Sequence, residues 1–353
     1  KGHPWEILRP EYSCEVSSNG QSAPFAGDPV RRSWVSTDKV IAVPYDLPIA
    51  GYRNGTVNTL RLWSSRAAEE FLSDYQHHGD YVRACEDNAL SGTITKVLFP
   101  EENVLRATEK RLKQQYFFIS ASLQDIVRRY KLLNSSMDDF DAKVAIQLNG
   151  SRCSLAIAEL MRLLVDIEGV AWDTAWKITR NVFSYTSHAV SKDELENWPV
   201  YLVSQIFPRH MEIIFEINQK HLDEIRKEGG DSVRFIPELS LIEEGEVKRI
   251  RMAQLALIGS SVVNGVSKAQ TEALTKKVFP AVASAMPGKI TCKTNGIAHR
   301  RWLLTANRPL ARLITEAIGE GWIRNSEELI RLETMVDDSE FLVRLDGVKR
   351  EAK

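Results

Sequence analysis

Residues 143–155 read KVAIQLNGSRCSL, and this stretch decides the fold. The apolar run 144–148 predicts a strand, the Asn, Gly and Ser of residues 149–151 predict a tight turn, and a helical pattern begins at Ser154. A strand, a turn and a helix in this order are typical of an open α/β sheet. Such sheets bind ligands beyond the carboxyl ends of their strands, so we expect a site beside residues 149–153.

The segments that follow repeat this alternation of strand and helix. Residues 154–168 place apolar side chains on one helical face, and residues 174–180 predict a second, shorter helix. Residues 182–186 are β-branched and aromatic, as strands prefer. Strand, helix, helix and strand form the rhythm of a parallel crossover. The predicted fold class is therefore α/β, with a Rossmann-like parallel sheet and flanking helices.

The rest of the chain mixes strand and helix patterns. Residues 40–64 predict a hairpin or two adjacent strands, the chain turns helical beyond Ala67, and residues 109–131 predict the longest helix. A short strand is predicted at residues 262–266. Further helical patterns occupy residues 199–226, 244–257, 309–318, 325–335 and 338–350.

Length and charge narrow the function classes. A chain of 353 residues, 43% hydrophobic and 26% charged, can bury a large core in two domains or one large α/β domain. Its 46 Lys and Arg residues against 47 Asp and Glu residues give a net charge of −1. This balance supplies no long-range field for polyanions, so we expect neither a nucleic acid nor an anionic membrane as a partner.

Cysteines and apolar runs bear on the compartment. Cys14, Cys85, Cys153 and Cys292 form no CxxC or Cys/His pattern, so we expect no metal site and no disulfide framework. No apolar run reaches the roughly 18 residues of a spanning helix, and we expect a cytoplasmic protein. Because the chain starts at Lys1 without a methionine, we also expect it to be a piece of a longer protein.

Short motifs spread over almost the whole chain carry a family resemblance. They include Pro4-Trp5-Glu6, Gly51-Tyr52-Arg53-Asn54, VNTLRLW at 57–63, Arg111-Leu112-Lys113-Gln114-Gln115-Tyr116, Ser122-Leu123-Gln124-Asp125-Ile126, Pro208-Arg209-His210, Lys248-Arg249-Ile250-Arg251-Met252-Ala253 and Lys293-Thr294-Asn295-Gly296-Ile297. Together with KVAIQLN at 143–149, they resemble the glycogen phosphorylase family, the α-1,4-glucan phosphorylases.

The resemblance implies a two-domain glycosyltransferase of the GT-B type, with pyridoxal phosphate between Rossmann-like domains. By this match, residues 1–295 are a partial N-terminal glucan phosphorylase domain, and residues 296–353 are the mostly helical start of the C-terminal domain. The family's reaction uses inorganic phosphate to release glucose 1-phosphate from glycogen or a maltodextrin. A homodimer is implied as well, and the lysine that attaches the cofactor falls outside this chain.

Four residues match the family's catalytic cleft. His188 and Asn295 match residues that hold the glucose 6-hydroxyl, and Trp302 matches a tryptophan that lies against the cofactor. Asn103 falls in a gating loop whose asparagine reaches the sugar. Three of them also have plainer interpretations: His188 as a strand-end histidine that satisfies backbone groups, the Asn-Gly at 295–296 as a turn, and Trp302 as a core residue.

Other cleft positions depart from the family. Where the family has Asn-Asp-Thr-His-Pro after the strand, this chain has Asn149-Gly150-Ser151-Arg152-Cys153. Ala189 follows His188 and Ala298 follows the Asn295 loop where the family has other residues, and Glu101-Glu102 precede Asn103 in an altered gate. These substitutions predict a kept fold with an altered cleft.

Two further surfaces resemble family binding sites. Arg128 and Arg129 match a pair that receives an effector phosphate, although basic residues at a helix end also complement the helix dipole. A glycogen storage site is matched by Arg209, Asn218, Gln219, Ser240, Glu244 and Lys248. Glu244 and Lys248 could equally be an i,i+4 pair on a solvated helix face.

Two functions follow from these observations. The first is a glycogen phosphorylase, a hexosyltransferase of glycogen breakdown, present as an incomplete chain. The second is a degenerate, non-catalytic relative that acts as a glucan-binding or scaffold subunit. His188, Asn295 and Trp302 favour the first, whereas Gly150 and Arg152 favour the second.

Overall fold

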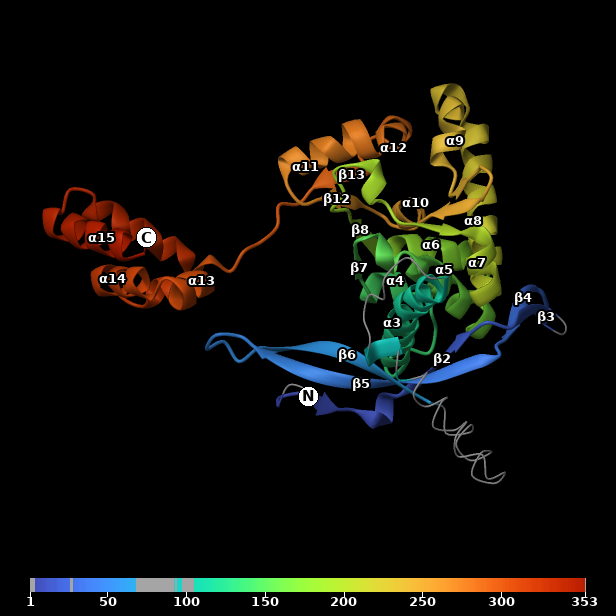
Figure 1. Ribbon diagram of the computed structural model, residues 1–353, viewed down its shortest axis with the longest axis horizontal. Coiled ribbons are helices and arrows are strands. Elements are labelled where there is room, and N and C mark those ends of the chain that lie inside the picture. The colour runs from blue at the N-terminus through green and yellow to red at the C-terminus, as the bar shows by residue number, and fades with distance from the viewer. Residues whose placement is uncertain (1–3, 26–27, 68–91, 93, 97–104, 353) are drawn as a thin grey trace. The chain divides into compact units, whose positions relative to one another are not determined.

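The computed structural model describes residues 4–25, 28–67, 92, 94–96 and 105–352. Two compact units appear in it (Figure 1): residues 1–49 with 59–294, and residues 50–58 with 295–353. The structural division after Thr294 lies next to the predicted boundary at residues 295–296. Which parts of a longer enzyme these units represent stays a prediction.

A four-stranded sheet lies at the centre of the first unit. Its strand order is β13 (Ile290–Cys292), β12 (Val263–Gly265), β8 (Phe183–Thr186) and β7 (Ile146–Asn149). All three pairings are parallel, and Asn149 pairs with Thr186 at the carboxyl ends of β7 and β8. The predicted strands at 144–148, 182–186 and 262–266 and their parallel crossover are confirmed.

Helices cover the apolar face of this sheet. The chain passes from β7 into α5 (Leu155–Arg162) and then α6 (Trp172–Val182) before it returns as β8 (Figure 1). Leu148, Tyr185 and Val263 are buried, and they share one hydrophobic cluster with these helices. Burial of this continuous apolar surface fixes the helices against the strands.

Long helices extend this core. The predicted helix at 109–131 is present as α3 (Leu105–Lys131), and the pattern at 199–226 forms α7 (Val200–Ile206) and α8 (Pro208–Glu228). Pro208 occupies the first position of α8, where a missing N–H costs nothing. The segment from Ala67 that was predicted as helical lies mostly outside the described residues.

Antiparallel strands precede the helical core. The predicted hairpin is present, since β5 (Asp38–Ala50) pairs with β6 (Val57–Ala67). β1 (Ile7–Leu8) and β2 (Cys14–Ser18) also pair with β5, and β3 (Gln21–Phe25) pairs with β4 (Asp28–Val35). The sequence predicted the β5–β6 hairpin, but it did not predict β1, β2, β3 or β4.

The helix predicted at residues 244–257 is wrong in its first half. Residues 249–251 are strand β11 (Arg249–Arg251), which pairs with β10 (Ile242–Glu243) and with β9 (Asn197–Pro199). Only α10 (Met252–Ile258) is helical. Glu244 and Lys248 therefore lie in the loop of a hairpin, although they still form an ion pair of 3.0 Å. The four-residue spacing of Glu244 and Lys248 is typical of a helix. The pairing of β11 with the distant β9 determines the structure instead.

Shorter helices complete the first unit. They are α4 (Phe140–Lys143), α9 (Ile236–Leu239), α11 (Lys268–Ala273) and α12 (Pro280–Ala285). The second unit is mostly helical, as predicted, with α13 (His299–Ala306), α14 (Arg308–Ile318), a 3-10 segment (Ser326–Met335) and α15 (Ser339–Glu351). Its own small core centres on the fully buried Trp322.

A charged network is sealed inside the first unit. Glu159 of α5 is fully buried and accepts hydrogen bonds from Tyr116 (3.0 Å) and Ser120 (2.9 Å) of α3. Arg162 binds the same carboxylate at 2.7 Å, and the buried His210 of α8 lies 2.7 Å from it. This network joins three helices through one carboxylate.

Candidate functional site

The turn after β7 is fixed by backbone geometry. The Gly150 N–H donates to the carbonyl of Thr186 at 3.0 Å, so the turn extends the register of β7 against β8. Gly150 has φ +87° and ψ 162°, a conformation that is essentially restricted to glycine. Gly150 is therefore required by the turn as this chain builds it.

His188 and Asn149 meet beside this turn. The Nε2 of His188 lies 2.5 Å from Oδ1 of Asn149, and both side chains are exposed. The approach of His188 is set by the preceding residue, because the Ser187 N–H donates to the Asn264 carbonyl at 3.0 Å. Two strand ends thus present an imidazole and an amide to solvent at the edge where ligands of such sheets bind.

A row of polar side chains, missed in the sequence analysis, crosses the exposed face of the sheet. Gln147 Nε2 donates to Thr186 Oγ1 at 2.7 Å, and Thr186 Oγ1 donates to Asn264 Oδ1 at 3.0 Å. The signal was the alternation in β7, where Gln147 and Asn149 are exposed and Leu148 is buried. These groups suit hydrogen bonding to a hydroxyl-rich ligand.

The turn offers no strong acid or nucleophile of its own. Burial raises the pKa of the Cys153 thiol, and the nearby Glu196 adds to the shift, so Cys153 stays protonated. Arg152 is exposed in the same turn. What the described residues supply here is positioning by neutral hydrogen-bonding groups beside one imidazole.

Known proteins match this chain over its whole length. The family model for carbohydrate phosphorylases matches residues 1–353. The chain is 45% identical to the liver form of glycogen phosphorylase from Ovis aries, covering 100% of this chain and 42% of that protein. It is 44% identical to the brain form from Rattus norvegicus and the muscle form from Oryctolagus cuniculus, covering 100% of this chain and 43% and 42% of those proteins. The chain belongs to the carbohydrate phosphorylase family. It spans about two fifths of the length of the relatives it matches.

Trp302, which was expected to lie against the cofactor, and Asn295, which was expected to hold the sugar, lie in the second unit. Trp302 of α13 is 67% exposed, and no residue of α13 is buried. Asn295 is also exposed, while Asn103 lies outside the described residues. Because a cofactor needs an enclosed pocket and Trp302 lies on an open surface, Trp302 and its neighbours in α13 do not enclose one by themselves.

Residues matched to the phosphorylase storage site differ in availability. Arg209 is buried and donates to both carboxylate oxygens of Asp166, at 2.8 and 2.9 Å. Asn218 accepts from the Leu241 N–H at 2.8 Å and from the Ser240 hydroxyl at 3.4 Å. Gln219, Glu244 and Lys248 remain on the surface. The accessible part of this set is therefore Gln219 on α8 and the pair Glu244 and Lys248 in the β10–β11 loop.

The arginine pair expected at an effector phosphate is engaged within the first unit. Asp125, one turn earlier on α3, binds Arg128 at 2.6 Å and Arg129 at 3.2 Å. The guanidinium of Arg128 also lies 4.2 Å from the ring centroid of Tyr12. Any phosphate bound here would compete with the Asp125 carboxylate.

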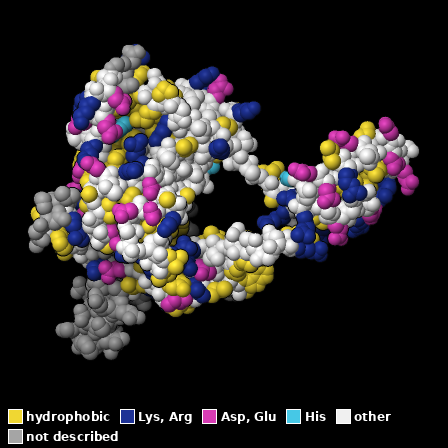
Figure 2. Space-filling model, turned by 180° about the vertical axis from the view of Figure 1, so that it is seen from behind, with side chains coloured by type: hydrophobic (Ala, Val, Ile, Leu, Met, Phe, Trp, Pro, Cys, Tyr) yellow, Lys and Arg dark blue, Asp and Glu magenta, His cyan; other side chains and the backbone are white. Residues whose placement is uncertain are grey.

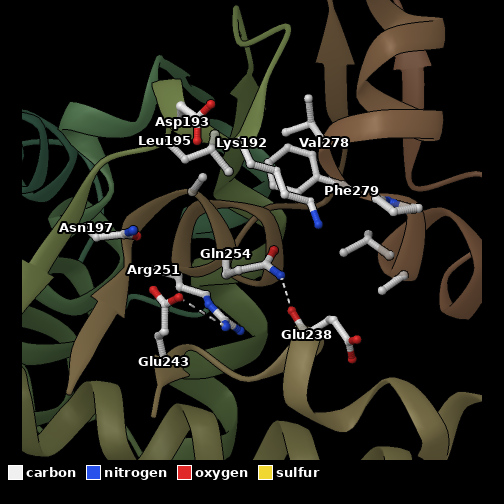
Figure 3. Close-up of a pocket in the computed structure, with 14 residues that line it drawn as sticks. Lys192, Asp193, Leu195, Asn197, Glu238, Glu243, Arg251, Gln254, Val278 and Phe279 are labelled. Atoms are coloured by element: carbon white, nitrogen blue, oxygen red, sulfur yellow. Dashed lines mark hydrogen bonds and ion pairs between the residues drawn. The ribbon is translucent and has the colours of Figure 1, made fainter. Parts of the chain in front are cut away.

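A cavity of about 400 Å³, lined by both polar and apolar side chains, lies beside the β10–β11 hairpin (Figure 3). Gln254 Nε2 donates to the Glu238 carbonyl at 2.6 Å, which fixes the amide orientation. Arg251 approaches Glu243 at 3.8 Å and donates to the Pro237 carbonyl at 2.7 Å. None of the predicted site residues is among those that line this cavity.

On the face seen in Figure 2, basic and acidic side chains lie interspersed over the larger unit. Among the residues that the structure describes, no group of three or more His, Cys, Asp or Glu could hold a metal ion. Within the same residues, no helix is both long and apolar enough to cross a membrane.

Proposed function

We propose that this chain is part of an α-1,4-glucan phosphorylase. The enzyme uses inorganic phosphate to cleave the terminal α-1,4 bond of glycogen or a maltodextrin, and it releases glucose 1-phosphate. Family membership over the whole chain supports this reaction class, as do the relatives, which are glycogen phosphorylases.

The observation that carries the proposal is the contact between His188 and Asn149. A 2.5 Å contact fixes one imidazole nitrogen, while the ring remains exposed at the carboxyl edge of the sheet. An exposed, oriented imidazole is suited to hold a sugar hydroxyl. We infer that His188 holds the glucose 6-hydroxyl. The family resemblance alone assigns Asn295 to the same hydroxyl and Asn103 to the sugar.

The finer architecture is inferred from the family alone. We infer a GT-B arrangement in which residues 1–295 belong to the N-terminal domain and residues 296–353 open the C-terminal domain. Pyridoxal phosphate is the inferred cofactor, with Trp302 against it and the attachment lysine elsewhere. A cytoplasmic homodimer under allosteric control, with an effector phosphate at Arg128 and Arg129, completes this inference.

Glucan anchoring is a separate part of the proposal. The exposed ion pair between Glu244 and Lys248 and the exposed amide of Gln219 offer the donors and acceptors that a glucan chain needs. Asn218 accepts from the Leu241 N–H and Ser240 from the Ile242 N–H, and both bonds shape the adjoining backbone. Arg209 contributes indirectly, because its hydrogen bond to Asp166 fixes the start of α8.

A second candidate is a non-catalytic glucan-binding or scaffold subunit. The specific observation in its favour is Gly150, whose glycine-restricted backbone stands where the family has an acidic residue. Loss of that acid removes one polar group from the cleft. It does not affect residues 244–248, the storage loop that carries Glu244 and Lys248.

One experiment separates the two candidates. The natural full-length protein is incubated with maltoheptaose and inorganic phosphate, and glucose 1-phosphate is measured against a phosphate-free control. Release that depends on phosphate supports the phosphorylase. Retention on glycogen without any release supports the scaffold.

A further inference from the structure

A second cavity lies at the amino ends of the parallel strands, whereas His188 lies at their carboxyl ends. Its volume is about 520 Å³, and three of its residues stand just before strands: Arg180 before β8, Ser261 before β12 and Lys289 before β13. His188 and Asn149 lie at the carboxyl ends of β8 and β7. Since the strands are parallel, the two places are on different edges.

His221 of α8 contributes a buried, unused nitrogen to this cavity. The residue is only 6% exposed, and its Nε2 has no hydrogen-bond partner among the residues described. A buried polar atom without a partner is costly, so native structures rarely keep one without a ligand or water. A hydrogen-bonding group from outside the described residues would satisfy this nitrogen.

The charges nearest to His221 are positive. Burial, followed by Arg180 and Lys289, lowers the pKa of His221 to about 4. Burial and Arg180 also lower the pKa of Lys289 to about 8. Lys289 donates one hydrogen bond to the Ser260 carbonyl, which leaves further ammonium protons for a ligand. Two cations that repel each other beside a buried imidazole are arranged for an anion.

The other lining groups indicate what the anion is attached to. Glu224 and Glu228 of α8 line the same cavity from exposed positions, and Trp176 of α6 supplies an aromatic wall. Carboxylates repel a free anion but accept hydrogen bonds from hydroxyl groups. Aromatic rings pack against the apolar part of a ligand, and a cavity of this size exceeds the needs of a bare phosphate.

We propose that this cavity binds a hydroxyl-bearing phosphate monoester of the sugar-phosphate class. Arg180, Lys289 and His221 hold the phosphate group, and Glu224 and Glu228 accept from the hydroxyls. The site is independent of the proposed phosphorolysis, because none of its residues lies near the turn at 149–153.

Calorimetric titration with sorbitol 6-phosphate tests the proposal. This compound carries the phosphate and the hydroxyls but cannot serve as a glucosyl donor, so its binding is measured without turnover. Loss of binding in the Arg180→Gln variant distinguishes this cavity from the cleft and from the pair Arg128 and Arg129. Each charged hydrogen bond lost should weaken binding about tenfold or more, so Arg180→Gln and His221→Phe should each show that loss. Arg226→Gln is the matched control, since Arg226 lies on α8 but pairs with Asp223 away from the cavity.

Further arms identify the recognised groups. Inorganic phosphate should bind more weakly than sorbitol 6-phosphate, and sorbitol alone should give no heat. The proposal would be overturned if the wild type and Arg180→Gln bound sorbitol 6-phosphate with equal affinity. It would also be overturned if the wild type did not bind this compound up to about 10 mM. Arg180 is exposed, so its variant should fold even where His221→Phe does not.

Discussion

The imidazole of His188 and the amide of Asn149 meet at 2.5 Å, across the carboxyl ends of two neighbouring parallel strands. The contact connects the segment that decides the fold with the residue best suited to hold a sugar. It depends on the β7–β8 register, in which Asn149 pairs with Thr186. Changes that disturb this turn should therefore be felt at His188.

Gly150→Ala should destabilise the protein by about 1–3 kcal/mol, because φ +87° with ψ 162° is strained for any residue with a Cβ. Open space around the position means that strain, not a clash, is the cause. The free energy of unfolding in urea measures this cost. Gly245→Ala is the control, because Gly245 lies in a loop of the same unit without a positive φ and should change stability little. Equal stability of Gly150→Ala and wild type would show that the turn tolerates other conformations.

Glu159→Gln should cost about 3–5 kcal/mol, since it leaves the buried Arg162 without its countercharge. Burial opposes ionisation of Glu159, but Arg162 and His210 outweigh it and hold the pKa of this carboxyl well below its usual range. Thermal unfolding compared with Glu168→Gln gives the contrast, because Glu168 pairs with Lys131 nearer the surface. If both variants lose the same stability, the buried Glu159 network contributes no more to stability than an ion pair near the surface.

Stability should fall as the pH drops from about 6.5 towards 4. His221 has a pKa lowered from 6.5 to about 4, by burial first and then by Arg180 and Lys289. In this window the unfolded chain takes up a proton that the folded protein does not. The free energy of unfolding therefore falls by up to about 3 kcal/mol. His221→Phe should flatten this slope, and His210, whose pKa burial also lowers, should account for part of what remains. Unfolding free energies of wild type and variant between pH 4 and 7 check the prediction, and identical slopes would contradict it.

Removal of the exposed storage-loop pair, by Glu244→Ala with Lys248→Ala, should weaken retention on glycogen without a measurable loss of stability. Surface ion pairs contribute less than about 1 kcal/mol, so a change in retention would report binding. Co-sedimentation with glycogen is the measurement. Glu272→Ala with Lys276→Ala removes another exposed pair with the same spacing and serves as the control. Unchanged retention by the storage-loop variant would argue against this surface as an anchor.

The sequence predicted those elements whose signals are local. The strand at residues 144–148 and the helix at 109–131 have clear periods, and both are present. Strands β2 to β4 were not predicted, because their residues are mostly polar and are interrupted by Gly20 and Pro24. The helix expected at 244–257 failed because β11 pairs with β9, a partner some fifty residues earlier that no local pattern reveals.

The candidate site was predictable in its parts but not in its contacts. The turn and His188 could be selected from the sequence, yet their hydrogen bond requires the parallel register of β7 and β8. Burial of Arg209 was equally hidden, because Asp166 lies 43 residues away along the chain. The charges before β8 and β13 gave no motif at all, since only the sheet brings Arg180 and Lys289 together.

The most direct test of the central claim is the rate of phosphate-dependent glucose 1-phosphate release by the natural full-length protein and by its His188→Ala variant. A hydrogen bond to the sugar lost in the transition state should lower kcat/KM by about tenfold to a hundredfold while the variant stays folded. Equal kcat/KM values would contradict the role of His188, and no release by the wild type would contradict the phosphorylase assignment itself.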